Sequence, residues 1–144
     1  MNEEDEDTIK QIAIKFRQAI ERTPKAKLPE RFANFPAMCC GDASRMLGKY
    51  LEQRGYDPVL VETRAVRFDP WVRDHLTNTD HAWLRLGTTI VDITADQYGQ
   101  AKVIVSSDSP WHEKLEGRRS VNRDFRLHGA LDRAYEVVLA VPMC

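Results

Sequence analysis

A change in the spacing of apolar residues near Pro58 constrains the fold more than any other feature of this chain. Over residues 8–23 and 41–54, apolar side chains recur every three or four positions, which predicts two amphipathic helices. After Pro58 the apolar residues are more often β-branched and gather in short runs, which is typical of strands. The pattern predicts an α+β domain in which N-terminal helices pack on a mostly antiparallel sheet.

The limits of these elements follow from local signals. Thr8 and Pro24 are expected to bound the first helix, and Gly55 the second. Ser109-Pro110 is typical of a helix start and predicts a short helix that ends at Gly117. The segments interpreted as strands are 59–66, 81–86, 89–94, 102–106 and 135–141, and those interpreted as connections are 24–38 and 67–80. The pattern over 118–133 is ambiguous and is assigned to no element.

Length and charge restrict what the chain does. Its 144 residues predict a single domain, residues 1–144, and 42% apolar with 30% charged residues is typical of a packed globular protein. Because 21 Lys and Arg face 22 Asp and Glu, no overall field favours nucleic acid or an anionic membrane. The basic residues between Arg118 and Arg126 are therefore interpreted as a solvated face.

Other signals favour the cytoplasm. Residues 1–7 are acidic, unlike a secretory signal, and are expected to form a flexible tail. No apolar run approaches the roughly 20 residues that a membrane-spanning helix needs. Three cysteines, two of them adjacent at Cys39 and Cys40, are a poor basis for disulfides and fit a reducing compartment.

No cofactor is expected, because the usual metal and phosphate motifs are missing. The chain has no Cys-x-x-Cys, His-Glu-x-x-His, calcium-loop or glycine-rich phosphate pattern. His75 and His112 lie near predicted loops without ligand partners at suitable spacing, and are interpreted as satisfied or solvent-facing histidines. No metal ligands are therefore assigned.

Cys40 lies where a helix start favours a thiolate. Unpaired backbone N–H groups and the helix dipole stabilise negative charge there. Gly41 leaves room for a substrate carbonyl, and backbone N–H groups at the turn could stabilise an oxyanion. A buried structural cysteine is the alternative interpretation.

His81 and Asp92 are expected to face each other across a hairpin. A turn centred between Leu86 and Gly87 makes them directly opposed residues on one face of the sheet. Asp92 would then orient the His81 imidazole; a simple cross-strand polar contact is the alternative interpretation, which spacing alone favours. With Cys40, they satisfy the Cys-His-Asp logic of nucleophilic acyl transfer.

These residues also resemble a known family. The chain is similar to the transglutaminase-like, papain-fold cysteine proteins of bacteria at Phe35-Pro36, Cys39-Cys40-Gly41-Asp42-Ala43-Ser44, His81-Ala82-Trp83-Leu84, Val91-Asp92-Ile93-Thr94-Ala95-Asp96-Gln97-Tyr98 and Trp111-His112. The resemblance implies a catalytic cysteine on a helix packed against a sheet that supplies His and Asp, here Cys40, His81 and Asp92. It implies peptidase, amidase, deamidase or transglutaminase chemistry on a protein or peptide substrate.

Further residues carry weaker expectations. Cys40 is preferred to Cys39 because the family's cysteine directly precedes Gly-Asp, so Cys39 is a neighbour or an oxidation partner. Asn34 stands where papain-like enzymes have an oxyanion-hole glutamine, and its shorter amide can also donate. Trp83 either lines the site or fills the core. Asp96 and Gln97 follow the hairpin and could border the cleft, although turn capping explains Asp96 equally well.

One competing class of function stays open at this point. A papain-like fold without turnover would serve as a protein-binding module, engaging a partner through the basic segment from Arg118 to Arg126. Such a module predicts an unreactive thiol. An enzyme predicts one thiol that reacts quickly at neutral pH and depends on His81.

Overall fold

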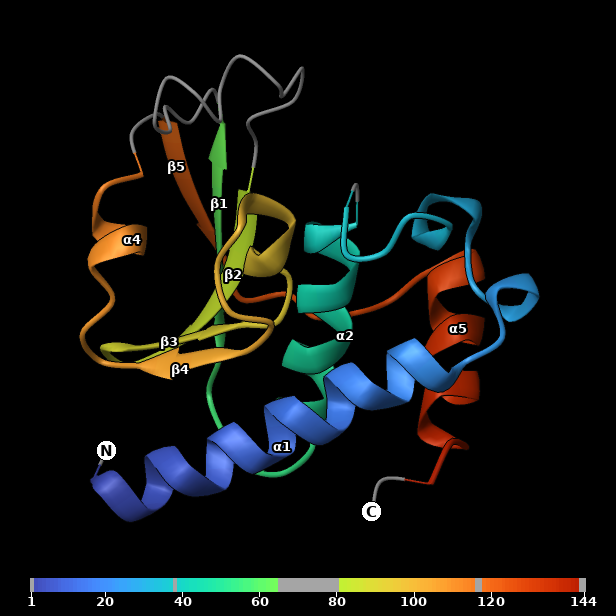
Figure 1. The fold of residues 1–144 in the computed structure, drawn as a ribbon. Helices are drawn as coiled ribbons and strands as arrows, with labels where there is room; N and C mark the ends of the chain where they lie inside the picture. Colours follow the sequence, from blue (N-terminus) through green and yellow to red (C-terminus); the bar gives the residue numbers. More distant parts are fainter. Residues whose placement is uncertain (1, 38, 65–80, 116–117, 143–144) are drawn as a thin grey trace.

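A computed structural model describes residues 2–37, 39–64, 81–115 and 118–142 of the chain. These residues form a five-stranded antiparallel sheet with helices on both faces (Figure 1). The strands are β1 Val59–Arg64, β2 His81–Leu86, β3 Thr89–Asp92, β4 Ile104–Ser106 and β5 Arg118–Asn122, in the order β4-β3-β2-β1-β5. The helices are α1 Glu3–Arg22, α2 Cys40–Glu52, α4 Pro110–Glu113 and α5 Gly129–Leu139. The predicted α+β class and antiparallel sheet are confirmed.

Helix α1 begins at Glu3, not at the predicted Thr8. The side-chain oxygen of Asn2 accepts a hydrogen bond from the Asp5 amide at 2.9 Å and caps the helix. The prediction of a flexible acidic tail is therefore wrong from Glu3 onwards: acidic side chains in a first turn are stabilised by the helix dipole. Among the helices described, none is long and apolar enough to cross a membrane.

The two faces of the sheet bury different clusters. On one face, Leu60, Leu84 and Val91 join apolar residues of α1, α2 and α5 in the larger core. On the other, Val61, Trp83 and Leu115 form a smaller cluster beside α4. Figure 1 shows α2 and α4 on opposite sides of the sheet. The alternation of side chains along β1 and β2 thus separates the helical core from a second, smaller layer.

Two predictions of secondary structure after residue 118 were wrong or incomplete. Residues 135–139 of the strand expected over 135–141 instead belong to helix α5, whose buried residues Leu131, Ala134, Tyr135 and Val138 recur at helical spacing. The strand was predicted because the adjacent residues Val137 and Val138 are β-branched, a feature that favours strands over helices. Residues 118–122, which were assigned to no element, form β5 and pair with β1.

The other elements were predicted to within a few residues. Helix α2 and strands β1 and β2 match their expected ranges closely, whereas β4 and α4 are shorter than expected. The connection predicted over 67–80, with His75, lies outside the described residues.

The β2–β3 hairpin differs from its predicted register by two residues. Leu86 pairs with Thr89, so the turn consists of Gly87-Thr88, and Gly87 takes the positive φ that such a two-residue turn requires. Continued along the strands, this register places Asp92 opposite Trp83, not opposite His81. Because side chains alternate with a period of two, a two-residue error leaves His81 and Asp92 on the same face.

Candidate active site

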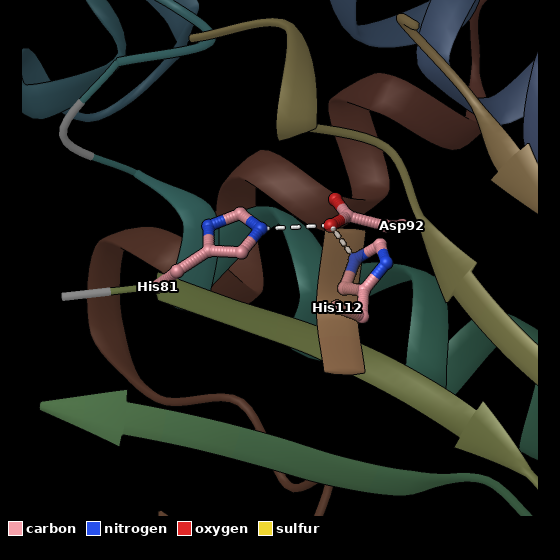
Figure 2. Close-up of side chains that lie close together, drawn as sticks. All are labelled: His81, Asp92 and His112. Atoms are coloured by element: carbon pink, nitrogen blue, oxygen red, sulfur yellow. Dashed lines mark hydrogen bonds and ion pairs between the residues drawn. The ribbon is translucent and has the colours of Figure 1, made fainter. Parts of the chain in front are cut away.

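Three buried side chains from three elements meet on the α4 face of the sheet. His81 is the first residue of β2, Asp92 is the last of β3, and His112 lies in α4. All three are at most 2% exposed to solvent. Figure 2 shows the Asp92 carboxylate between the two imidazoles, each joined to it by a hydrogen bond.

The Asp92 carboxylate is held by three donors. Its Oδ2 lies 2.7 Å from Nε2 of His81 and 2.7 Å from Nε2 of His112, and its Oδ1 accepts from the Thr94 amide at 2.9 Å. An ionised carboxylate only accepts hydrogen bonds, so both imidazoles donate through Nε2. In the neutral form of His81, the other ring nitrogen, Nδ1, is then left as a base.

These contacts shift both titrating groups toward their charged forms. Burial alone would raise the pKa of Asp92, but the charge of His81 and the hydrogen bond from His112 hold it well below its usual range. Burial alone would lower the pKa of His81, yet the charge and hydrogen bond of Asp92, followed by those of Cys40, raise it to about 9. The site therefore favours an imidazolium beside a carboxylate.

Cys40 begins α2 at the edge of this network. The Ser44 hydroxyl donates to the carbonyl oxygen of Ala82 at 3.4 Å and ties the start of α2 to the start of β2. Cys40 is partly exposed, and its interaction with His81 contributes, after that of Asp92, to the raised pKa of the imidazole. The fold thus brings together the predicted Cys40, His81 and Asp92.

Cys39 has a different environment from its neighbour. It is buried, and its thiol donates to the carbonyl oxygen of Pro36 at 3.7 Å. Burial first, and then the charge of Cys40, raise the pKa of Cys39 to about 12. Because the thiolate is the nucleophilic form, these surroundings favour Cys40 as the reactive residue.

Aromatic rings surround the His81 imidazole. The ring centroids of Tyr98, Trp111 and Trp83 lie 5.2, 5.5 and 5.6 Å from that of His81. Trp83 is also 4.9 Å from the His112 ring and packs in the smaller apolar cluster. It therefore combines its two predicted roles, filling the core and forming a wall of the site that keeps water from the imidazoles.

The predicted oxyanion donor, Asn34, lies in the turn before Cys39. Its side chain is exposed, and its backbone carbonyl accepts from the Ala37 amide. Its role stays a prediction. Gln97, which was expected with Asp96 at the border of the cleft, has an amide nitrogen 3.5 Å from Nδ1 of His81.

Asp42 and Asp96 each pair with an arginine. Asp42 lies in the first turn of α2, as expected, and forms an ion pair with Arg31. Asp96 accepts two hydrogen bonds from Arg17, at 2.8 and 2.9 Å, rather than only capping a turn. Arg17 is buried on α1, a position that its charge gave no reason to expect.

His112 is the site residue that sequence reasoning missed. It was interpreted as a satisfied or solvent-facing histidine, and the structure buries it with partners on both ring nitrogens. Its position directly after Trp111 and three residues after Ser109 indicates a helix start but gives no link to Asp92. Only the packing of α4 on the sheet supplies that link.

The same three side chains could in principle hold a metal ion. One ligand atom from each of His81, Asp92 and His112 lies within 4.8 Å of the others. Around a tetrahedral zinc with ligand bonds near 2.1 Å, neighbouring ligand atoms would lie about 3.4 Å apart. The 2.7 Å separations from Asp92 to each imidazole instead match direct hydrogen bonds.

In comparisons with models of protein families, with curated proteins and with solved structures, this chain matched none of them. The case for a function therefore rests on the geometry around Cys40 and on the sequence resemblance.

Proposed function

We propose that this protein is a cysteine-dependent acyl-transfer enzyme that acts on an amide bond of a protein or peptide. The observation that carries the proposal is the hydrogen bond between His81 Nε2 and Asp92, which leaves Nδ1 as the base. Cys40 is near enough to the same imidazole to raise its pKa. This arrangement matches the base, orienter and nucleophile of a catalytic triad.

The reaction begins with proton transfer from the Cys40 thiol to Nδ1 of His81. The thiolate attacks the amide carbonyl, a carbon–sulfur bond forms, and negative charge develops on the carbonyl oxygen. Backbone N–H groups at the start of α2 stabilise this charge, with the Asn34 or Gln97 amide as a further donor. Asp92 stays ionised and keeps the imidazole oriented.

The second half returns the enzyme to its starting state. Nδ1–H of His81 protonates the leaving amine as the carbon–nitrogen bond breaks, and the acyl group stays on Cys40. Water or another amine then loses a proton to His81 and attacks the thioester. The carbon–sulfur bond breaks, His81 returns the proton to the Cys40 sulfur, and the product is an acid or a new amide.

The resemblance to transglutaminase-like, papain-fold proteins supports the same chemistry. Peptidase, amidase, deamidase and transglutaminase reactions share the acyl-enzyme and differ in the group that resolves it. The partly exposed Cys40 and the unpaired thiol of Cys39 also fit the reducing cytoplasm that we propose as its compartment.

The test is the pH dependence of alkylation by iodoacetamide, with the labelled cysteine mapped by mass spectrometry. We expect rapid labelling of Cys40 well below the pH at which a free thiol ionises, and slow labelling in His81→Ala. Cys39→Ala is the matched control and should label like the native protein. Slow labelling of Cys40 at ordinary thiol pH would reject the enzyme and favour a binding module of the same fold.

If Cys40 is labelled rapidly, amide substrates can be screened for turnover. In that screen, Cys40→Ala provides the second test. The variant should lose all turnover while retaining the fold, as measured by circular dichroism. Full activity in Cys40→Ala would exclude this thiol as the nucleophile.

A further inference from the structure

His112 forms a second connection to the carboxylate that orients His81. Its Nε2 lies 2.7 Å from Asp92 Oδ2, the same oxygen that receives Nε2 of His81. Both rings and the carboxylate are buried, so neither hydrogen bond competes with bulk water. A triad alone requires only one of these two imidazoles.

A contact with Ser109 is independent evidence that the orientation of the His112 ring is fixed. Ser109 is the N-cap residue of α4, where a serine side chain usually accepts from a backbone N–H of the first turn. Here the side chain makes no capping hydrogen bond. Its hydroxyl lies 2.5 Å from Nδ1 of His112 instead, so the two ring nitrogens of His112 have partners on opposite sides.

We propose that His112 is a positioning residue for the acyl transfer assigned to Cys40, and that it acts by holding the Asp92 carboxylate in the orientation that His81 requires. This inference rests on the proposed function. In this arrangement Ser109 donates to Nδ1 of His112, His112 donates to Asp92 through Nε2, and Asp92 accepts from Nε2 of His81. The chain of hydrogen bonds runs from α4 through β3 to β2.

A second donor matters because His81 gains and loses a proton twice in each turnover. If His81 alone contacted Oδ2, the carboxylate could follow the ring or turn about its own bonds whenever that ring lost a proton. Three donors from β2, α4 and the backbone at Thr94 fix the carboxylate plane. The His112 hydrogen bond also lowers the pKa of Asp92, so the carboxylate stays ionised throughout.

Other charged and titratable groups around His112 must be considered when the pH profile of Cys40 labelling is interpreted. Asp92 and His81 face it from the sheet. Arg85 and Glu113 line, together with His112, a cavity of about 110 Å³. A change in the pH profile must therefore be compared with a variant that leaves all four groups in place.

The experiment measures the rate constant for iodoacetamide labelling of Cys40 across pH in two substitutions of His112. His112→Phe keeps a planar ring but removes the donor, and we expect labelling near neutral pH to fall roughly tenfold, the lower range for partners that orient a functional histidine. His112→Gln places an amide N–H near the former Nε2 position and should recover most of the rate. Ser109→Ala, which removes one hydroxyl, should give an intermediate rate.

Val61→Ala is the matched structural control, because Val61 is buried in the same cluster without a polar contact to the site. It should lower stability without changing the pH profile of labelling. An unchanged profile in His112→Phe overturns the inference. The inference is also overturned if the labelling rate falls in His112→Phe, is not recovered in His112→Gln and falls equally in Val61→Ala. That result would assign His112 a packing role only.

Nitrogen-15 NMR of the histidine rings separates this inference from the proposed function. We expect His81 to be a single Nε2–H tautomer when neutral in the native protein, and a mixture of tautomers in His112→Phe. Slow labelling of native Cys40 rejects the enzyme, whatever the NMR result. Fast labelling with an unchanged His81 tautomer in His112→Phe rejects only the role of His112.

Discussion

Asp92 and Asp96 lie four residues apart, and each is bound by side chains from distant segments. Asp92 accepts from the imidazoles of His81 and His112, both at 2.7 Å. Asp96 accepts from the two terminal nitrogens of Arg17 at 2.8 and 2.9 Å. The first network joins α4 to the end of β3, and the second joins α1 to the 3-10 turn Ala95–Tyr98 that follows β3. Their donors differ in one chemical property, the ability to release a proton.

That difference separates a structural clamp from a reactive site. A guanidinium stays charged over the pH range in which proteins fold, and its two parallel hydrogen bonds fix geometry. Arg17 also donates to the Ile93 carbonyl and lies over the Phe35 ring, so it ties α1 to the segments on either side of the site. An imidazole can give and take a proton near neutral pH, which suits it for catalysis.

Among the substitutions that test this distinction, Asp92→Asn should have the largest effect on the reactivity of Cys40. The amide can donate to Nε2 of His81, which favours the Nδ1–H tautomer and removes the base that Cys40 needs. We expect the rate of Cys40 alkylation near neutral pH to fall by roughly 10²- to 10⁴-fold. Asp96→Asn is the matched change in the other network and should keep the rate within a few-fold. Equal losses in both variants would contradict a functional distinction between them.

Arg17→Met should mainly affect stability. Removing one partner of a largely buried ion pair leaves Asp96 without its counter-charge, and we expect the free energy of unfolding to fall by about 3 kcal/mol in urea titrations. The folded fraction should alkylate at close to the native rate. The double variant Arg17→Met with Asp96→Leu should recover part of the stability, because it removes the unpaired charge.

The imidazole network should make stability depend on pH. The folded pKa of His81 is about 9, against 6.5 for an unperturbed histidine, so its contribution is complete below pH 6.5 and is lost as pH rises through about 9. Asp92, whose pKa is lowered, contributes above its ordinary value of 3.8 and loses that contribution in stronger acid. Stability from this network is thus greatest between these two ordinary values.

The contribution of His81 can be measured by urea titrations of the Cys40→Ser variant between pH 6.5 and about pH 8. In this variant the reactive thiol is absent, and Cys39 begins to affect the pH dependence of stability only at higher pH. We expect the free energy of unfolding to fall with pH, by at most about 1.4 kcal/mol per pH unit. The fall should disappear when Asp92→Asn is added. A slope that survives this change would assign it to another group.

Thr94→Val should have the smallest effect, at a residue between the two acids. The Thr94 hydroxyl is buried with no hydrogen-bond partner among the described residues, whereas its backbone amide donates to Asp92. Valine keeps the amide and the shape but removes the unpaired oxygen, so we expect a gain of about 1 kcal/mol in the free energy of unfolding. The alkylation rate should not change. A loss of stability would mean that the hydroxyl has a partner.

Local pattern was sufficient for much of the fold. The helical spacing before Gly55 predicted α1 and α2, because each of these helices buries one regular face. The β-branched run after Pro58 predicted β1, and the turn at Gly87 predicted the hairpin that contains β2. The same reasoning failed at α5, where a helical period and a β-branched pair compete and packing against α1 and α2 decides. It also failed at Glu3–Asp7, where a capped first turn accommodates the acidic charges.

The candidate triad shows where sequence reasoning reaches its limit. Chain order predicted that Cys40, His81 and Asp92 act together, and face parity placed His81 and Asp92 on one side of the sheet. Parity survived a register error of two because side chains along a strand repeat every two residues. Only the tertiary structure brought His112 to Asp92 and Arg17 to Asp96, since these contacts join segments separated by 20 and 79 residues. Spacing along a chain carries no information about which distant donor will meet a buried carboxylate. That is decided when helices pack on a sheet and every buried charge must find a partner.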